Sequence, residues 1–380
     1  MPEPIDKQSC FCDNFGNDTG NDAGTSLSPN KRRMRRNRKA ITIQDVAKAA
    51  GVSVSTVSRV LNNKDDVAFE TFDKVRQVIE ELHYSSSLAA RGMRSHQTNV
   101  IGLIIPEVAS PFCHLIMRGV NRAIAKLNKD LLIYTSGGAR KENIAQHEQS
   151  YVSLLNGGIT DGIIVVTPTA TNFTTHAPVV IIDPNNESPD FPSISSTNRE
   201  GALAAMNYLT GLGHRRIGFI TGRMELISAN QRLQGYRDGL AALGIPLDQK
   251  LIEIGDYSTE QAVLCARKLI SLPNRPTAIF AANDMTALGV YQAAKEAGLD
   301  IPNDLSVVGF DNLDGSCLMV PALTTVDQSV EEIGTIATEM INSLINDEKL
   351  KFKQHIIQTR LIIRDSCSPS IAIEPATHAV

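Results

Sequence analysis

The side chains in this sequence with the clearest capacity for binding chemistry are cations, and they are concentrated in one short region. Counting Lys and Arg against Asp and Glu gives −4 for residues 1–30, +7 for residues 31–97 and −7 for residues 98–380. Seven of the nine residues in 31–39 are basic. A local positive patch attracts nucleic-acid phosphates even in a chain whose net charge is −4. We therefore expect a nucleic-acid contact within 31–97, where residues 31–39 form either an arm that adds phosphate contacts or a solvated charge run.

Motifs for enzymatic or cofactor chemistry are missing from the sequence. Neither of the phosphate-binding patterns G-x-x-x-x-G-K-[ST] and G-x-G-x-x-G occurs, and there is no G-x-S-x-G or H-E-x-x-H. The eight histidines are dispersed, and we expect His214 to be a helix-end or loop residue rather than a general base. The six cysteines form no C-x-x-C pair, which argues against a zinc site. The sequence thus predicts no cofactor, no metal ion and no enzymatic activity.

The basic region carries a helical pattern. Segments 43–50, 54–61 and 75–82 place apolar residues at helical spacing, and a glycine separates the first two. Ser53 can cap the second helix by accepting a hydrogen bond from a backbone N–H. Two short helices joined by a tight turn are typical of a helix-turn-helix, so residues 41–84 are predicted to form a small all-α DNA-binding domain. The outer face of its second helix would carry Val54, Ser55, Ser58 and Arg59.

From residue 98 onward, short apolar runs alternate with helical stretches, a pattern typical of strands buried on both faces of a parallel sheet. About ten strands are too many for one compact wound sheet. The sequence therefore predicts an α/β domain of two doubly wound lobes over 98–366, with a ligand in the cleft that faces the carboxyl ends of the strands. The runs are 100–105, 131–134, 162–166, 179–182, 217–220, 251–254, 278–281, 307–310, 323–326 and 356–363.

The remaining segments are expected to connect or extend these domains. Residues 1–40 are polar and then basic, with few large apolar side chains, so we expect a disordered tail. Residues 85–97 are predicted to form a hinge helix and linker, and residues 367–380 a flexible C-terminal tail. No apolar run approaches the roughly 20 residues that span a bilayer, and the N-terminus lacks the pattern of a secretory signal. We therefore expect a cytoplasmic protein that does not contact the membrane.

Several motifs together resemble one family. The run Thr42-Ile-Gln-Asp-Val-Ala-Lys-Ala-Ala-Gly-Val-Ser-Val-Ser-Thr-Val-Ser-Arg-Val-Leu-Asn62 resembles the N-terminal signature of the LacI family of repressors. Ala89-Ala-Arg-Gly-Met93 and Arg232-Leu-Gln-Gly-Tyr236 agree with it, as do blocks at 282–289, 307–311 and 321–325. The resemblance implies a homodimer that binds near-palindromic, double-stranded operator DNA at the nucleoid. It also implies allosteric control by a small molecule, of which a sugar is the commonest kind in the family.

The resemblance implies which residues contact DNA. It places the second helix in the major groove, where Val54, Ser55 and Arg59 would face base edges; Arg59 has the donors for a bidentate contact to guanine. The hydroxyl and amide groups of Thr42, Ser53, Thr56 and Asn62 would bind phosphates. In the hinge, Ala90 and Met93 would contact the minor groove, with Met93 as the apolar wedge. The alternatives are that Val54 and Arg59 are merely exposed and that Met93 is ordinary linker.

The resemblance also implies an effector site like that of periplasmic sugar-binding proteins. A carboxylate opposite a guanidinium, with amides nearby, matches the donors and acceptors of a sugar, and an aromatic ring can cover its apolar face. Asp183 and Asn283 directly follow strands, so they are equally compatible with turn or cap roles. Two other functions remain open, a periplasmic-type solute receptor and a sugar-acting enzyme with Asp183 and Asp311 as its acid/base pair. The implied effector contacts are Phe112, Asp183, Arg232, Asn283, Asp284, Asp311 and Gln328.

Overall fold

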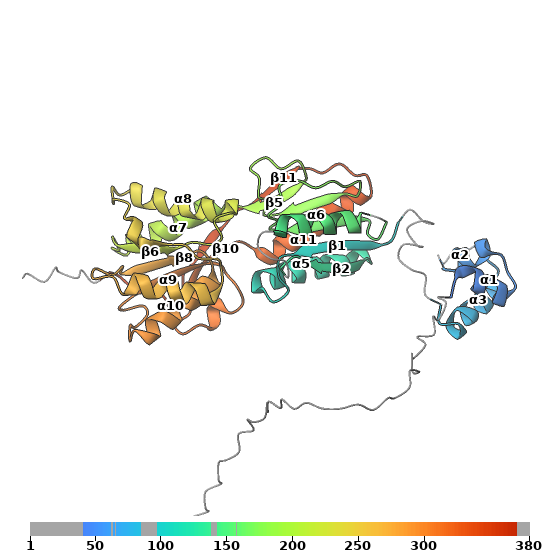
Figure 1. Ribbon diagram of the computed structural model, residues 1–380, viewed down its shortest axis with the longest axis horizontal. Coiled ribbons are helices and arrows are strands. Elements are labelled where there is room, and N and C mark those ends of the chain that lie inside the picture. Colours follow the sequence, from blue (N-terminus) through green and yellow to red (C-terminus); the bar gives the residue numbers. More distant parts are fainter. Residues whose placement is uncertain are drawn as a thin grey trace, which may run out of the picture. The chain divides into compact units, whose positions relative to one another are not determined.

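The structure is a computed structural model that describes residues 41–61, 64, 66–84, 97–137, 143–156 and 158–370. The chain divides between residues 85 and 86 into two units (Figure 1). The described part of the first unit is helical, and the second contains two α/β lobes. No helix in the described ranges is both long and apolar enough to cross a bilayer.

The first unit, which we call the headpiece, is a three-helix domain formed by α1 (Ile43–Ala50), α2 (Val54–Leu61) and α3 (Phe69–Glu81). Gly51 ends α1 in the left-handed conformation with φ 67°, a geometry that glycine adopts without strain. Val46, Val57 and Val75 are fully buried and join the three helices in one small core. The predicted helix-turn-helix is confirmed.

The first lobe of the second unit, the N-lobe, is a six-stranded parallel sheet covered by helices. Its strand order is β11-β5-β4-β3-β1-β2, and every described pairing within it is parallel. The strands are β1 (Val100–Ile105), β2 (Asp130–Thr135), β3 (Gly162–Val166), β4 (Val179–Ile182), β5 (Ser193–Ser196) and β11 (Gln354–Ile357), and the helices are α5 (Pro111–Leu127), α6 (Ile144–Leu155) and α11 (Val330–Ile345).

The second lobe, the C-lobe, repeats this plan with strand order β12-β10-β9-β8-β6-β7. Helices α7 and α8 cover one face of its sheet, and α9 and α10 cover the other (Figure 1). Only β12 runs antiparallel to its neighbour among the described pairings. The strands are β6 (Ile217–Ile220), β7 (Ile252–Glu253), β8 (Ala278–Ala281), β9 (Ser306–Asp311), β10 (Thr324–Asp327) and β12 (Arg360–Ile362), and the helices are α7 (Asn198–Gly211), α8 (Ile227–Ala241), α9 (Thr259–Ile270) and α10 (Asp284–Glu296).

The chain passes between the lobes after β5, after β10 and after β11. Two strands next to these crossovers differ from the sequence-based prediction. The apolar run 356–363 is not one strand, because β11 ends in the N-lobe and β12 begins in the C-lobe. Strand β5 was missed because its sequence, Ser-Ile-Ser-Ser, is polar although three of its four residues are buried.

The C-lobe extends beyond the predicted boundary at residue 366. Ser368 N donates to Ser306 Oγ at 3.1 Å, and Ser370 N donates to the Leu212 carbonyl oxygen at 2.8 Å. Cys367 packs against the core beside them. The prediction of a flexible tail from residue 367 is therefore wrong for 367–370. The predicted tail segments 1–40 and 371–380, and most of the predicted hinge, lie outside the described residues.

Candidate functional site

The outward face of α2 is the candidate DNA-reading surface of the headpiece. Val54 is 40% exposed and Ser55 is exposed, whereas Val57 and Val60 are buried in the core. The guanidinium of Arg59 is exposed, and its Nη1 lies 3.5 Å from the Asp66 carboxylate. An exposed ion pair of this length contributes little to stability, so the guanidinium is available to another acceptor.

Hydroxyl groups gather at the first turns of α1 and α2. Thr42 and Asp45 form a capping box in which the Thr42 Oγ1 to Asp45 Oδ2 distance is 2.8 Å. Ser53 Oγ accepts a hydrogen bond from Thr56 N at 3.1 Å, as the sequence predicted for a cap. Helix N-termini attract phosphates, so the first turns of α1 and α2 are suited to contacts with the sugar-phosphate backbone of DNA. Asn62, Ala90 and Met93 lie outside the described residues, and their DNA contacts stay predictions.

A cavity of about 170 Å³ lies between the lobes of the second unit. Its lining follows from the topology, because parallel strands bring their carboxyl ends to one edge of each sheet. Residues that end or follow strands of both lobes therefore meet here: Glu107, Thr167, Asp183, Arg223, Tyr257, Asn283 and Asp311.

Five of the seven predicted effector residues line this cavity, namely Phe112, Asp183, Arg232, Asn283 and Asp311. Asn283 also caps α10, because its Oδ1 accepts a hydrogen bond from Thr286 N at 2.8 Å. The cap and the ligand-contact interpretations of Asn283 are thus compatible, since the amide nitrogen is left for the cavity. Gln328 and Asp284 do not line the cavity.

Arg232 is buried at the base of the cavity, with only 6% of its side chain exposed. Its Nε donates to Asn198 Oδ1 at 2.9 Å, and its Nη1 donates to the Ala282 carbonyl oxygen at 2.5 Å. The guanidinium carbon also lies 3.8 Å from the centre of the Phe310 ring. A buried cation needs this many partners because desolvation of an unpaired charge costs several kcal/mol.

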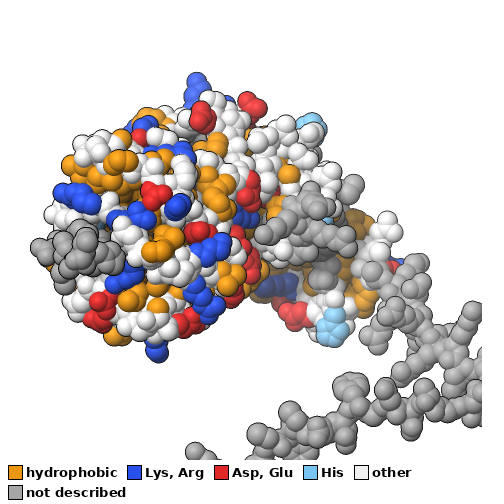
Figure 2. Space-filling model, turned by 60° about the vertical axis from the view of Figure 1, so that its left-hand side comes forward, with side chains coloured by type: hydrophobic (Ala, Val, Ile, Leu, Met, Phe, Trp, Pro, Cys, Tyr) orange, Lys and Arg blue, Asp and Glu red, His pale blue; other side chains and the backbone are white. Residues whose placement is uncertain are grey.

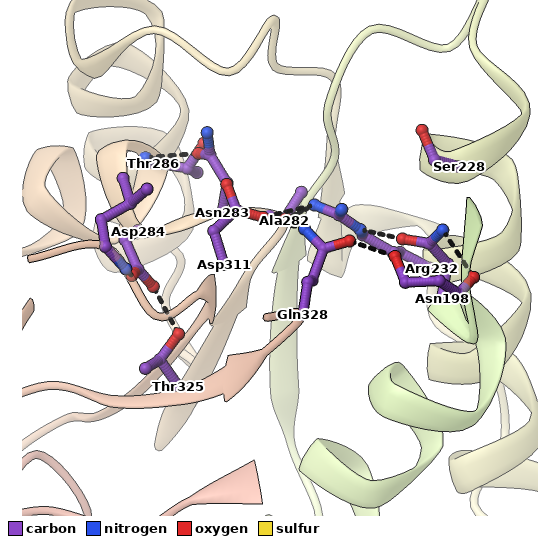
Figure 3. A network of polar contacts seen from close by, with 12 residues as sticks. Asn198, Ser228, Arg232, Ala282, Asn283, Asp284, Thr286, Asp311, Thr325 and Gln328 are labelled. Carbon is purple, nitrogen blue, oxygen red and sulfur yellow. Dashed lines mark hydrogen bonds and ion pairs between the residues drawn. The ribbon is translucent and has the colours of Figure 1, made fainter. Parts of the chain in front are cut away.

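Asp311 links Arg232 to the crossovers. Its Oδ1 lies 3.5 Å from Arg232 Nη1 and accepts a hydrogen bond from Gln328 Nε2 at 2.5 Å (Figure 3). Gln328 Oε1 in turn accepts a hydrogen bond from Ser196 Oγ of another crossover. Burial raises the pKa of Asp311 to about 6, and the Arg232 guanidinium limits the rise. Gln328 therefore acts on the site through Asp311 rather than by lining it.

The third crossover is tied to the first by paired threonines. Thr359 N donates to Thr197 Oγ1 at 2.9 Å, and Thr359 Oγ1 donates to the Thr197 carbonyl oxygen at 3.0 Å. Together with the Ser196 to Gln328 contact, these bonds hold all three crossovers in one hydrogen-bonded set. A change at the cavity can therefore reach the hinge between the lobes through Asp311.

Apolar and polar contacts join the lobes on the cleft side, where Leu313 of the C-lobe is buried in the N-lobe core and Met285 packs against it. Ser228 Oγ of α8 donates to Asp183 Oδ2 at 2.8 Å, and Ile227 N donates to Asn185 Oδ1 at 3.1 Å. Outside the cavity, Arg118 of α5 pairs with Asp314 at 2.7 Å. Burial raises the pKa of Asp183. Each of these contacts has to break when the cleft opens.

The prediction that Asp284 contacts the effector is not supported by its position. Its carboxylate accepts hydrogen bonds from Leu313 N at 2.7 Å and from Thr325 Oγ1 at 2.5 Å. Figure 3 shows Asp284 directed toward Thr325, apart from the cluster around Arg232. The physical reason is helical geometry: Asp284 is the first residue of α10, so its side chain turns to the loop after β9 while Asn283 faces the cavity. Burial raises its pKa to about 8, with the like charge of Asp311 as the second cause.

Several cavity residues were not predicted from the sequence, of which Tyr257, Ser228 and Arg223 are the most informative. Tyr257 lies with φ 74° in the loop after the two-residue strand β7, and its ring centre is 5.8 Å from the Arg232 guanidinium carbon. A rule that takes polar and aromatic residues up to four positions after each strand would have found Arg223 and Tyr257. His214 is a loop residue, as predicted, and its ring contacts Thr277 and Ser306 in the C-lobe core.

Sequence comparisons agree with both units. The model for bacterial regulatory proteins of the lacI family matches residues 42–87, and the model for a periplasmic binding protein-like domain matches residues 206–367. Catabolite control protein A of Priestia megaterium is 34% identical over 318 residues, which cover 81% of this chain and 93% of that protein. The HTH-type transcriptional repressor PurR of Vibrio atlanticus is 33% identical over 324 residues, which cover 83% and 96%.

Solved structures of regulators are similar to this chain over most of its length. The lac repressor dimer bound to operator and the anti-inducer ONPF has a TM-score of 0.73 and 25% identity, covering 87% of this chain and 100% of that one. The complex of the transcriptional regulator CelR with cellobiose has a TM-score of 0.64 and 28% identity, covering 86% and 99%.

The titration of Asp284 should be visible in the stability of the two-lobed unit. Unfolded aspartate titrates near about 3.9, whereas folded Asp284 has a pKa of about 8. The folded state therefore retains a proton that the unfolded state releases, so the free energy of unfolding should fall as pH rises between these values. Asp284→Asn should reduce the slope of this decline between pH 5 and 8 by up to roughly 1.4 kcal/mol per pH unit. Urea denaturation at several pH values measures the slope. The exposed control Glu260→Gln should keep the wild-type slope, and equal slopes for all three chains would contradict the assignment.

Proposed function

The chain belongs to the lacI family of bacterial regulatory proteins, and from this premise we propose how its own residues carry out regulation. It is a DNA-binding transcriptional regulator of the repressor type and not an enzyme. In our proposal, α2 of each headpiece in a homodimer reads one half of a near-palindromic operator, and a sugar in the cavity between the lobes changes operator affinity. Its place of action is the cytoplasm, at the nucleoid.

The observation that carries the DNA side is the exposed face of α2, with Val54, Ser55 and Arg59 side by side on a packed three-helix domain. Arg59 has the paired donors that guanine O6 and N7 accept, and Val54 offers an apolar surface to a thymine methyl group. Thr42, Ser53 and Thr56 at the helix ends would bind phosphates and fix the register. Met93 remains the proposed minor-groove wedge.

The effector side is supported by the composition of the cavity. Asp183, Arg232, Asn283 and Asp311 supply acceptors and donors from both lobes, and Phe112 supplies an aromatic wall. This set fits a polyhydroxylated ligand better than a purely apolar one. The solved CelR relative holds cellobiose, which makes a sugar the first class to test here. A ligand that changes the angle between the lobes would act on the crossovers through Asp311 and Gln328.

A homodimer is supported by exposed apolar side chains on the α10 side of the C-lobe. Leu288 is 41% exposed, Leu318 78% and Val320 91%. Tyr291 Oη of α10 donates to the Pro321 carbonyl oxygen at 3.0 Å, so α10 and the loop that carries Leu318 and Val320 are neighbours. Figure 2 shows hydrophobic side chains reaching the surface among charged ones. Clustered exposed apolar side chains are characteristic of an interface between copies.

Removal of the Arg59 guanidinium should relax base selection. We expect Arg59→Ala to lose roughly 1–3 kcal/mol of discrimination at one base pair of each half-site, because no other α2 side chain can replace its paired donors. The measurement is selection of binding sites from random duplex DNA, followed by titration of the selected site and its single-base variants. Arg76→Ala on α3, which removes the same charge from the headpiece, should keep the base preferences. Unchanged preferences in Arg59→Ala would refute the reading role.

The interface proposal predicts a change of mass in solution. Val320→Asp and Leu288→Asp would bury a charge between the subunits, so each should raise the dimer dissociation constant at least about tenfold. Sedimentation equilibrium measures this constant. Leu243→Asp is the matched control, because Leu243 is 52% exposed and follows α8 on the other side of the sheet. A dimer that survives both interface variants would place the contact elsewhere.

Effector binding should couple the cavity to the operator. A sugar that binds the folded cleft should raise the melting temperature and change operator affinity by about 5–150-fold, the usual range of allosteric coupling. Phe112→Ala should weaken both effects, whereas Phe352→Ala, at a 55% exposed phenylalanine outside the cavity, should change neither. A sugar that stabilises the chain equally in both variants would bind somewhere other than this cavity.

A further inference from the structure

We infer that Arg364 is a positioning residue of the subunit interface, because it fixes the loop that presents Leu318 and Val320 to a second copy of the chain. This loop, residues 312–323, connects β9 to β10, and we call it the interface loop. The role of Arg364 rests on the homodimer proposed above. It adds a residue that governs association through the loop and is not one of the apolar contact residues.

The exposed part of the interface loop has little packing of its own. Leu318 and Val320 are 78% and 91% exposed, so burial does not hold them in place. Leu313, near the start of the loop, is buried, and its N–H donates to Asp284 Oδ2 at 2.7 Å. One short 3-10 turn, η3 (Ser316–Leu318), lies between these two parts. A turn of this kind has poor hydrogen-bond geometry, so the exposed part depends on contacts from outside the loop.

The Arg364 guanidinium supplies contacts to the start, the middle and the end of the interface loop. Its Nη2 donates to Asn312 Oδ1 at 2.7 Å. Its Nη1 donates to Ser316 Oγ at 3.1 Å and to the Leu323 carbonyl oxygen at 2.7 Å. A planar guanidinium holds its donors in a fixed fork, so this one side chain sets the positions of three separate acceptors relative to one another.

The backbone that carries Arg364 is itself fixed to the C-lobe sheet. Arg364 N donates to Thr324 Oγ1 at 2.9 Å. Ser366 is fully buried, and its Oγ donates to the Val307 carbonyl oxygen at 2.5 Å and accepts a hydrogen bond from Thr324 N at 2.8 Å. The guanidinium therefore extends to the loop from a segment that is bound to β9 and β10.

Other side chains hold the interface loop at single residues. Tyr291 Oη donates to the Pro321 carbonyl oxygen at 3.0 Å, and Arg118 pairs with Asp314. Among the described side chains outside the loop, Arg364 alone forms hydrogen bonds with more than one loop residue. Hydrogen bonds from an ionised donor are stronger than those between neutral groups. The loss of this guanidinium should thus affect the loop more than the loss of any other single contact.

The test is the dimer dissociation constant of the full chain, measured by sedimentation equilibrium. Arg364→Ala should raise this constant at least about tenfold, because Leu318 and Val320 are then no longer held for the partner. Arg364→Lys keeps the charge but not the fork, so it should still raise the constant at least about threefold. Ser316→Ala removes one acceptor and should also raise it about threefold. The double variant Arg364→Ala with Ser316→Ala should lose less than the product of the two single losses, because the two residues share one contact.

Arg216→Ala is the matched control at the opposite edge of the same sheet. Arg216 Nε donates to the Asn274 carbonyl oxygen at 2.5 Å, and its Nη1 pairs with Asp248 at 2.9 Å. Its removal costs the C-lobe a comparable set of bonds, and it should leave the dimer dissociation constant within about twofold of the wild-type value. An equal rise in Arg216→Ala and Arg364→Ala would overturn the role of Arg364.

Hydrogen exchange measured by mass spectrometry separates loosening of the loop from loss of folding. In the background of Val320→Asp, which removes the partner, Arg364→Ala should raise the exchange rates of amides within 313–323 at least about tenfold and leave those of α7 and α8 unchanged. A uniform rise through the C-lobe would indicate general destabilisation and contradict a positioning role. Where Arg364→Ala does not fold, Arg364→Lys and Ser316→Ala carry the same comparison.

The outcomes distinguish this role from the proposed interface. If Val320→Asp dissociates the dimer while the Arg364 variants leave the dissociation constant unchanged, the role of Arg364 is overturned and the interface stands. If the wild type is a monomer, or its dimer survives Val320→Asp, the proposed interface is lost and the role of Arg364 with it.

Discussion

The buried guanidinium of Arg232 is the interaction on which the cleft of the two-lobed unit depends. Its Nε and Nη1 bind groups from the start of α7 and the end of β8, and its face lies over the Phe310 ring of β9. Loss of one partner would leave a charge buried without compensation, a change that costs about 3–5 kcal/mol in buried pairs. The ends of these elements must therefore stay together, and the acceptors at the cavity stay fixed with them.

The contacts between the lobes are unequal on the two sides of the cavity. At the crossovers, buried side chains bind one another: Ser196 at the end of an N-lobe strand binds Gln328, and within the C-lobe Gln328 binds Asp311 and Asn198 binds Arg232. On the cleft side, Leu313 and Met285 of the C-lobe pack against the N-lobe core, and the polar contacts include Asp183 to Ser228 and the exposed pair of Arg118 and Asp314. Exposed pairs contribute little. Because the three crossovers join the lobes covalently, the lobes should open at the cleft while the crossovers act as a hinge.

The sequence predicted most of the architecture, because buried parallel strands and short amphipathic helices leave clear apolar patterns. It failed where burial did not require apolar residues, as in strand β5, whose serines are held by hydrogen bonds at the crossovers. Strand-end position brought Asp183, Asn283 and Asp311 to the cavity as predicted. The same rule could not distinguish Asp284 from its neighbour Asn283. Asp284 is the first residue of α10, and the helical rotation turns its side chain away from the cavity. Tyr257 was missed because β7 is too short to mark the strand end.

The small size of the headpiece limits how much DNA sequence one subunit can recognise. Its core contains six fully or nearly fully buried side chains, so it buries little apolar surface on folding. In the proposed mode of binding, a domain of this size offers one short reading helix, and three side chains on α2 cannot supply the specificity that distinguishes one site in a genome. Two copies on one operator multiply their preferences, which makes the pairing of subunits part of DNA recognition. An effector that alters how two subunits are held can then control binding without contact with α2, and this explains why the ligand site can lie within the two-lobed unit.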